Sequence, residues 1–240
     1  MTGHVPGRAL PRLEPVGRRR PDPAALVLVA HGGRAGSRES GERRRLTYWR
    51  MLPFAKDLRR AGPELGVFML RYRHRGWNGA DRDAQRDVEA MLGELRRRHP
   101  GVPIVLLGHS MGGRAVLRAA GADGVVAVCA LAPWLDGSDP VAQLAGRSVL
   151  IAHGDRDRWT DPRQSLAYAV RAKAVTDRVA RFEVLGDGHS MLRRSGDWAS
   201  LVRRFVLGEI EIEPPDPDIT NAMRRPAPAG LTTVLTGAVR

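Results

Sequence analysis

The chain has 240 residues, which suits one domain of ordinary size with a substantial buried core. Its 42% hydrophobic and 27% charged residues are close to globular averages and argue against a largely disordered protein. The net charge is +13, but arginine supplies 37 of the 39 basic residues and is scattered along the whole chain, which argues against a specific nucleic-acid-binding stripe.

Short apolar runs and amphipathic segments alternate through the middle of the chain. Apolar runs that end in glycine or in turn residues indicate strands buried on both faces, and apolar residues at helical spacing indicate helices. In chain order we predict a strand at 24–33, a helix at 44–60, a strand at 66–76, a helix at 81–98, a strand at 102–110, a helix at 112–121, strands at 124–134 and 148–155, a helix at 163–175, a strand at 180–186 and a helix at 197–210. This alternation predicts an α/β fold with a mainly parallel sheet and helices on both faces.

Both ends of the chain differ from this pattern. Residues 1–23 and 212–240 are rich in proline, glycine and arginine without apolar periodicity, so we expect flexible tails around a single domain at 24–211. Proline interrupts the N-terminal segment, which therefore does not resemble a secretory signal. No apolar run reaches the ~18–20 residues of a membrane span. The single cysteine, Cys129, excludes an intrachain disulfide and a cysteine-rich zinc site. We expect a cytoplasmic protein.

A serine stands where a buried strand is predicted to end. Ligands of a parallel sheet bind beyond the carboxyl ends of its strands, so the residues there are the first candidates for chemistry. The pentapeptide GHSMG at 108–112 matches the G-x-S-x-G nucleophile elbow, a tight strand-to-helix turn that exposes the hydroxyl of Ser110. The glycines are needed because side chains would collide across the turn. The helix that begins at Met111 aims free N–H groups at an anion near this serine.

The serine needs two partners to become a nucleophile. A base must take the hydroxyl proton, and an acid must orient the base. His189 follows the last predicted strand, between glycines that would let its loop fold back toward Ser110, and is the candidate base. Carboxylates that follow the two preceding strands are the candidate acids: Asp155 and Asp157, and more remotely Asp136 and Asp139.

A glycine pair after the first strand suggests an oxyanion hole. Acyl transfer places negative charge on the carbonyl oxygen, which backbone N–H groups stabilise. We expect one N–H from Met111 and a second from Gly33, with Arg34 as the fallback donor. His31, in the same turn, is expected to be a structural hydrogen-bonding residue.

With a serine, an acid and a histidine in this order, and H-G-G before them, the sequence resembles the α/β-hydrolase superfamily over about residues 24–210. In that family the acid usually falls four residues after the histidine of an H-G-x-x-D segment. The spacing from His153 to Asp157 therefore favours Asp157 over Asp155. By resemblance, Ser110 would attack a carbonyl, His189 would act as base and then as acid, and Asp157 would hold the imidazole.

The resemblance also bears on cofactors and on the substrate. It implies no cofactor and no metal. Only about a dozen residues separate the strand at 124–134 from the next one, too few for a cap domain, so the sequence is similar to small lidless bacterial esterases and lysophospholipase-like hydrolases. A small-molecule carboxylic ester or thioester is the expected substrate. A non-catalytic binding protein of the same fold, a peptidase and a cofactor-free haloperoxidase remain alternatives.

Two tryptophans and three arginines are further candidates for substrate binding. Trp134 and Trp159 follow strand ends beside the proposed site, where they could line an acyl pocket or pack loops onto the core. Arg34, together with Arg156 and Arg158, could attract an anionic group such as the phosphate of a coenzyme A thioester.

Overall fold

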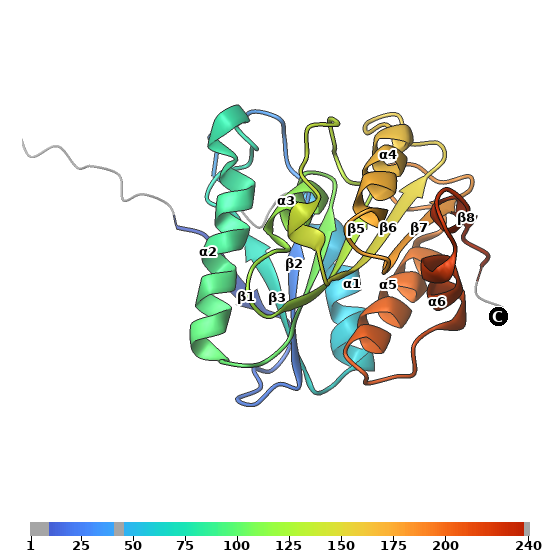
Figure 1. Ribbon diagram of the computed structural model, residues 1–240. Helices are drawn as coiled ribbons and strands as arrows, with labels where there is room; N and C mark the ends of the chain where they lie inside the picture. Colours follow the sequence, from blue (N-terminus) through green and yellow to red (C-terminus); the bar gives the residue numbers. More distant parts are fainter. Residues whose placement is uncertain (1–9, 41–45, 238–240) are drawn as a thin grey trace, which may run out of the picture.

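The structure is a computed structural model that describes residues 10–40 and 46–237. An eight-stranded sheet lies between two layers of helices (Figure 1). The strands are β1 (Arg12–Pro15), β2 (Ala25–Ala30), β3 (Leu65–Arg71), β4 (Ile104–His109), β5 (Val125–Leu131), β6 (Ser148–Gly154), β7 (Val179–Val184) and β8 (Thr233–Val234). The helices are α1 (Leu46–Ala61), α2 (Asp83–Arg98), α3 (Met111–Ala119), α4 (Pro162–Lys173), α5 (Ser195–Glu209) and α6 (Pro217–Arg224).

The sheet is parallel except at one edge. Its strand order is β1-β3-β2-β4-β5-β6-β7-β8, and only β1 pairs antiparallel with its neighbour. The carboxyl ends of β2, β4, β6 and β7 therefore share one edge, with β4 near the centre. This confirms the predicted mainly parallel α/β sheet and brings the strand ends singled out from the sequence to one side of the molecule.

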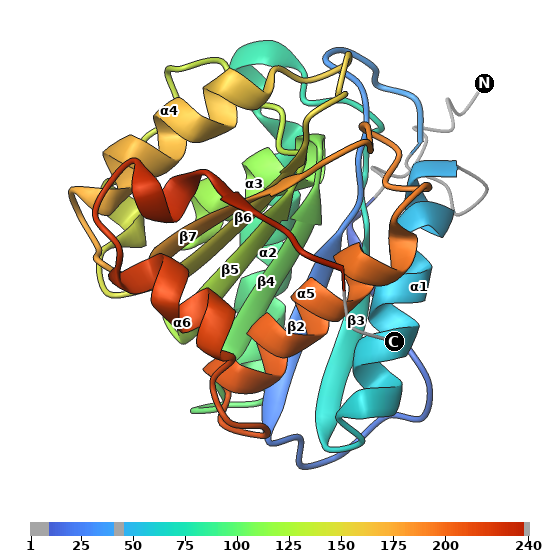
Figure 2. The same ribbon diagram turned by 90° about the vertical axis from the view of Figure 1, so that its right-hand side faces the viewer.

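Alternate residues of each strand face opposite helical layers, because side chains of a strand point alternately to its two faces. Val27 of β2 packs with the α1, α5 and α6 layer, whose largest fully buried side chain is that of Trp198. Leu28 packs on the other face with residues of α2, α3 and α4, such as Val116. Figure 2 shows the α1, α5 and α6 layer together on its own side of the sheet. Both faces are buried, which explains why the strands read as continuous apolar runs.

The N-terminal segment differs from the expected tail. Within 1–23, residues 12–15 form β1, which pairs antiparallel with β3 so that Leu13 lies opposite Leu70. The hydroxyl of Tyr48 also donates to the carboxylate of Glu14 at 2.7 Å. An antiparallel edge strand of four residues has too short a pattern to stand out in a proline-rich segment. Residues 1–9 lie outside the described residues.

The C-terminal segment also differs from the expected tail at 212–240. Helix α6 begins with Asp216 as N-cap, whose side chain accepts the N–H of Ile219 at 3.0 Å, and Pro217 occupies the first turn. Ile219 and Met223 are buried against the sheet, and β8 pairs with β7. The described part of this segment therefore belongs to the domain, because α6 covers an apolar face that would otherwise be open. Residues 238–240 lie outside the described residues.

The structure has no separate cap domain between β5 and β6, as predicted. Residues 132–147 contain only one short 3-10 turn, Ala142–Leu144. The start of the predicted helix at 44–60 falls partly in 41–45, outside the described residues, and α1 is described from Leu46. Among the helices in the described ranges, none is long and apolar enough to span a bilayer.

Candidate active site

Ser110 lies in the turn between β4 and α3, at the carboxyl edge of the sheet. Its backbone has φ 56° and ψ −120°, a positive-φ conformation that residues with a side chain rarely adopt. The N–H of Ser110 donates to the carbonyl of Leu131 at 3.0 Å, and its own carbonyl accepts the N–H of Trp134 at 3.1 Å. These bonds to β5 and to the loop after it hold the strained turn in place.

Two glycines let this turn close. A Cβ atom at Gly112 would lie 2.4 Å from the carbonyl oxygen of Ala30. One at Gly108 would lie 2.4 Å from the carbonyl oxygen of Gly112. Real Cβ atoms do not approach backbone oxygens so closely, so a side chain at Gly112 would push α3 away from the end of β2, and one at Gly108 would push β4 and α3 apart. The close approach explains the glycines on both sides of Ser110.

Ser110, His189 and Asp157 form one continuous chain of hydrogen-bonded side chains. The Nε2 atom of His189 lies 3.0 Å from Oγ of Ser110. Its Nδ1 atom lies 2.8 Å from Oδ2 of Asp157. The three residues follow β4, β7 and β6, so the shared carboxyl edge of the parallel sheet brings together residues up to 79 positions apart in the sequence.

The other candidate acids have different partners. Asp155 lies on the surface, and its side chain accepts the N–H of Gly186 at 2.6 Å. Asp136 and Asp139 both receive hydrogen bonds from the guanidinium of Arg114. These contacts turn all three carboxylates to groups other than His189, so the geometry favours Asp157.

The carboxylate of Asp157 is buried and fully hydrogen-bonded. Its Oδ1 atom accepts the backbone N–H groups of Trp159 at 2.8 Å and Thr160 at 3.0 Å. Its Oδ2 atom lies 2.8 Å from the Thr160 hydroxyl, in addition to its histidine contacts. Burial alone would raise the pKa of Asp157, but the hydrogen bonds from His153 and His189 outweigh it and hold the pKa well below its usual range. This carboxylate is therefore negative at neutral pH.

A second histidine contacts the same carboxylate. Nε2 of His153 lies 3.2 Å from Oδ2 of Asp157, and Nδ1 lies 2.9 Å from Oγ of Ser165. Burial lowers the pKa of His153, so its ring is neutral. A lone pair on Nε2 would face the lone pairs of the carboxylate, so the tautomer that fits carries its proton on Nε2. The sequence analysis used His153 only as a spacing marker and missed this contact.

A third histidine holds the backbone of the loop after β7. His109, next to Ser110 in the elbow, is buried, and its Nε2 lies 2.9 Å from the carbonyl oxygen of His189. Burial lowers the pKa of His109 to about 3, so the ring is neutral and donates its Nε2 proton to that carbonyl. The elbow therefore holds the main chain of His189 through His109. It also places the hydroxyl of Ser110 beside the imidazole of His189.

The expected oxyanion donors lie beside Ser110. Met111 opens α3, where the first N–H groups have no partner within the helix. The turn at Gly32 packs on the serine, since a Cβ on this glycine would lie 3.3 Å from Cβ of Ser110. The N–H of Arg34, the fallback donor, is occupied, because it donates to the carbonyl of Arg75 at 3.0 Å. Gly33 thus remains the predicted second donor.

The candidate substrate-binding residues lie on two different sides of Ser110. Trp134 packs edge-on against Trp77, with ring centroids 6.2 Å apart, and the guanidinium of Arg114 lies over both rings. Trp159 is 85% exposed and its ring stacks parallel to that of His189, at 6.0 Å. Arg34 is exposed on the Trp77 side, where it forms an isolated bridge with the neighbouring segment. The two tryptophans therefore do not line one common pocket.

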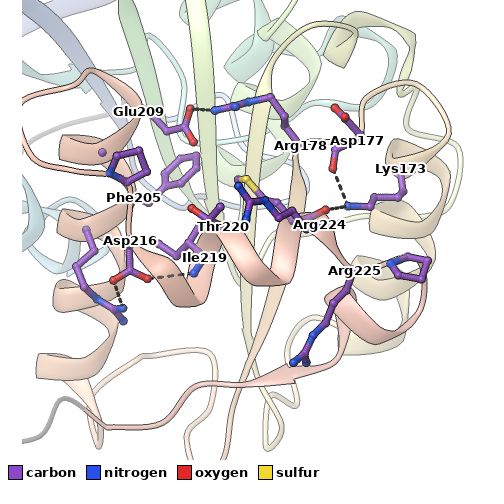
Figure 3. Close-up of a pocket in the computed structure, with 15 residues that line it drawn as sticks. Lys173, Asp177, Arg178, Phe205, Glu209, Asp216, Ile219, Thr220, Arg224 and Arg225 are labelled. Carbon is purple, nitrogen blue, oxygen red and sulfur yellow. Dashed lines mark hydrogen bonds and ion pairs between the residues drawn. The ribbon is translucent and has the colours of Figure 1, made fainter.

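A cavity of about 620 Å³ lies away from this site (Figure 3). It is bounded by the C-terminal end of α4 and by helices α5 and α6. Several of its charged side chains pair with one another: Arg178 donates to Glu209 at 2.7 Å, and Arg204 to Asp216 at 2.7 Å. Within the described ranges, no group of three or more His, Cys, Asp or Glu side chains is arranged to hold a metal ion.

The sequence of residues 26–238 matches the model of the alpha/beta hydrolase family. The chain belongs to the alpha/beta hydrolase family. Membership agrees with the strand order, the strained serine turn and the resemblance noted from the sequence, and it supports a hydrolase activity. No curated protein sequence matches the chain.

Solved alpha/beta hydrolases have a similar fold at low sequence identity. Est1E from Butyrivibrio proteoclasticus, solved with ferulic acid bound, is 18% identical, with a TM-score of 0.63 over 84% of this chain and 95% of the other. A lidless serine hydrolase from Xanthomonas campestris, XC6422, is 21% identical, with a TM-score of 0.59 over 87% and 97%. A monoacylglycerol lipase from Paleococcus ferrophilus is 17% identical, with a TM-score of 0.61 over 82% and 99%.

Proposed function

We propose that this alpha/beta hydrolase cleaves a carboxylic ester or thioester through an acyl-enzyme on Ser110, with His189 as base and Asp157 as the orienting acid. The continuous hydrogen-bonded chain from Ser110 Oγ through the imidazole to the Asp157 carboxylate is the observation that carries this proposal. The esterases and the lipase among the similar structures support an ester substrate.

In the acylation step, Oγ of Ser110 attacks the carbonyl carbon and its proton passes to Nε2 of His189. The carbonyl oxygen becomes an oxyanion, which the N–H groups of Met111 and Gly33 stabilise; removing one such donor typically costs about 3–4 kcal/mol. When the tetrahedral intermediate collapses, the bond to the leaving group breaks and His189 returns the proton to the leaving oxygen or sulfur. The serine is then esterified by the acyl group.

In the deacylation step, water replaces the leaving group. His189 takes one proton from the water, whose oxygen attacks the acyl carbon, and then returns that proton to Oγ of Ser110 as the acid is released. Throughout the cycle, the negative Asp157 holds the Nδ1 proton and stabilises the transient imidazolium. The buried donors around Asp157 keep it ionised, so the proton in transit stays on His189 and does not pass to the carboxylate.

Turnover of a series of 4-nitrophenyl esters of increasing chain length, run beside acyl thioesters, tests this function. The account expects hydrolysis by the wild type, and a fall in kcat of at least about 10³-fold in Ser110→Ala. Equal turnover by the wild type and Ser110→Ala would show that the serine is not the nucleophile. No turnover of any ester or thioester would overturn the proposed function.

A further inference from the structure

A basic hollow opens beside His189. It has a volume of about 510 Å³, and its walls include the side chains of Arg156, Arg158 and Arg193 together with Trp159 and His189 itself. We call it the arginine hollow. The first two arginines come from the loop after β6, and the third from the loop after β7, so two segments that also carry Asp157 and His189 build it. The sequence analysis singled out the first two arginines and missed the third.

The three guanidinium groups of the arginine hollow lack carboxylate partners. All three residues are exposed, and within the described part of the chain none forms an ion pair. In a chain with 37 arginines, an arginine near the site carries little information by itself. Many others are paired, as Arg114 is with Asp139 at 2.8 Å. What distinguishes this group is that three cations without an ion-pair partner among residues 10–40 and 46–237 share one hollow.

The acidic residues near the arginine hollow point elsewhere. Asp157 is turned inward to the imidazole of His189. Asp187 is 3% exposed, and its carboxylate accepts the N–H of Gly188 and the indole N–H of Trp198. Asp155 accepts a backbone N–H from the β7 loop. The hollow therefore presents an excess of positive charge to solvent.

Its position indicates which part of a substrate it would contact. In the proposed mechanism, His189 gives its proton to the leaving group, so the leaving group departs on the imidazole side of Ser110. The arginine hollow includes His189 and lies on this side, whereas Trp134 contacts Ser110 from the other. A charge bound in the hollow would therefore belong to the leaving alcohol or thiol.

We propose that the preferred substrate has an anionic leaving group, an alcohol or thiol that carries a phosphate or carboxylate bound in the arginine hollow. This inference rests on the proposed function and names its substrate class. Guanidinium groups bind both anions through paired N–H donors. The exposed indole of Trp159 and the side chain of Leu192 supply an apolar wall for the part of the leaving group between the charge and the scissile bond.

Two matched substrate pairs test the inference. The first is 3-carboxy-4-nitrophenyl butyrate and its neutral 3-carbamoyl twin. The second is the butyryl thioester of phosphopantetheine and that of pantetheine. At low salt, kcat/KM for the anionic member should exceed that of its twin by about tenfold, mainly through KM, since each exposed charge pair contributes about two- to fivefold. The advantage should shrink at about 0.5 M NaCl, where exposed charges are screened. Comparing the two pairs distinguishes carboxylate from phosphate.

Two triple variants locate the effect. Changing Arg156, Arg158 and Arg193 to Gln should bring the anionic-to-neutral ratio of kcat/KM close to one. The matched control removes the same charge from exposed arginines at the opposite end of the sheet: Arg18→Gln, Arg224→Gln and Arg225→Gln. It should keep the wild-type ratio, because those residues lie away from the site.

The outcomes separate the two proposals. Turnover of both members of each pair at equal kcat/KM overturns the inference and leaves the proposed function standing. An equal loss of the ratio in the two triple variants also overturns it, because the preference would then reflect net charge alone. No turnover of any of the four substrates overturns the proposed function and the inference with it.

Discussion

The imidazole of His153 lies with its Nε2 atom 3.2 Å from Oδ2 of Asp157. Oδ2 is the same oxygen that lies 2.8 Å from Nδ1 of His189, so one carboxylate oxygen serves two histidines. The imidazole of His153 is fully buried, and its hydrogen-bond partners are Asp157, Thr160 and Ser165. It therefore acts in the proposed mechanism as a positioning residue, which fixes the orientation of the carboxylate and keeps it ionised.

Replacing His153 tests this positioning role. In His153→Leu, Asp157 loses a donor, so kcat should fall about tenfold, the cost of one hydrogen bond to a charged group, with little change in KM. The pKa of Asp157 should rise, because a hydrogen bond that lowers it is gone. His153→Gln, which keeps a donor, should recover part of both effects. A loss of thermal stability in both variants with an unchanged kcat would contradict the role.

The choice of acid can be tested by comparing two neighbouring carboxylates. Asp157→Asn should lower kcat by about 10³- to 10⁴-fold, because an amide no longer stabilises the imidazolium and favours the wrong tautomer of His189. Asp155→Asn removes the same charge two residues away, where the side chain accepts a backbone N–H, and should change kcat by no more than a few-fold. Steady-state kinetics on one 4-nitrophenyl ester measures both. A larger loss in Asp155→Asn would mean that the acid is misassigned.

Packing predicts opposite effects on stability for two glycine substitutions, one beside Ser110 and one inside α2. The Cβ of Gly112→Ala would lie 2.4 Å from the carbonyl oxygen of Ala30, so the variant should lose about 1–3 kcal/mol of stability. Gly93 lies inside α2, where the nearest atom to an added Cβ is the flexible end of Arg97 at 3.6 Å. Gly93→Ala should gain about 0.5–1 kcal/mol. Thermal unfolding of the two variants should therefore shift Tm in opposite directions, and a shift of the same sign would be inconsistent with this packing.

Buried histidines predict that the fold loses stability in acid, and burial lowers the pKa of His153 as well as the pKa values of His31 and His109. Burial lowers the pKa of His31 to about 4 and that of His109 to about 3, against 6.5 in the unfolded chain. Between these values the unfolded state binds more protons than the folded state, so stability is present above pH 6.5 and falls as pH drops toward 4. Each histidine contributes a slope of up to about 1.4 kcal/mol per pH unit. Urea unfolding between pH 4.5 and 7.5 measures the slope.

A variant separates this contribution from that of other groups. His31→Asn should reduce the slope below pH 6.5, because it removes one of the three buried imidazoles, His31, His109 and His153. His74→Gln, at the protein surface, should leave it unchanged. Equal slopes in His31→Asn and the wild type would show that the buried imidazole of His31 does not control acid stability.

The sequence predicts the sheet and the positions of the candidate site well, for a physical reason. Strands buried on both faces read as continuous apolar runs, and a parallel sheet brings their carboxyl ends to one edge. Ser110 and His189 could therefore be selected from their places after two runs. The choice of Asp157 over Asp155 came from the family resemblance, through the H-G-x-x-D spacing that begins at His153. The sequence can indicate these positions because strands and helices alternate regularly along the chain, so each strand end can be recognised.

Other features have weaker local signals. Strands β1 and β8 have four and two residues and depend on pairing with β3 and β7. Helix α6 did have a signal, the pair Asp216 and Pro217 before spaced apolar residues, which a proline-rich composition concealed. The contact of His153 with Asp157 joins residues four apart and depends on how the loop after β6 turns back on that strand. The grouping of Arg193 with the other arginines arises where the loops after β6 and β7 meet, and no local sequence pattern indicates it.

The most direct test of the central claim is labelling with a fluorophosphonate, followed by intact-mass measurement and peptide mapping. An activated serine hydroxyl displaces fluoride and keeps the phosphonyl group, so the wild type should gain one adduct, located on Ser110. Ser110→Ala should gain none, and His189→Ala should react far more slowly, because its serine has no base. An unlabelled wild type, an adduct on another serine, or equal labelling of Ser110→Ala would contradict the account.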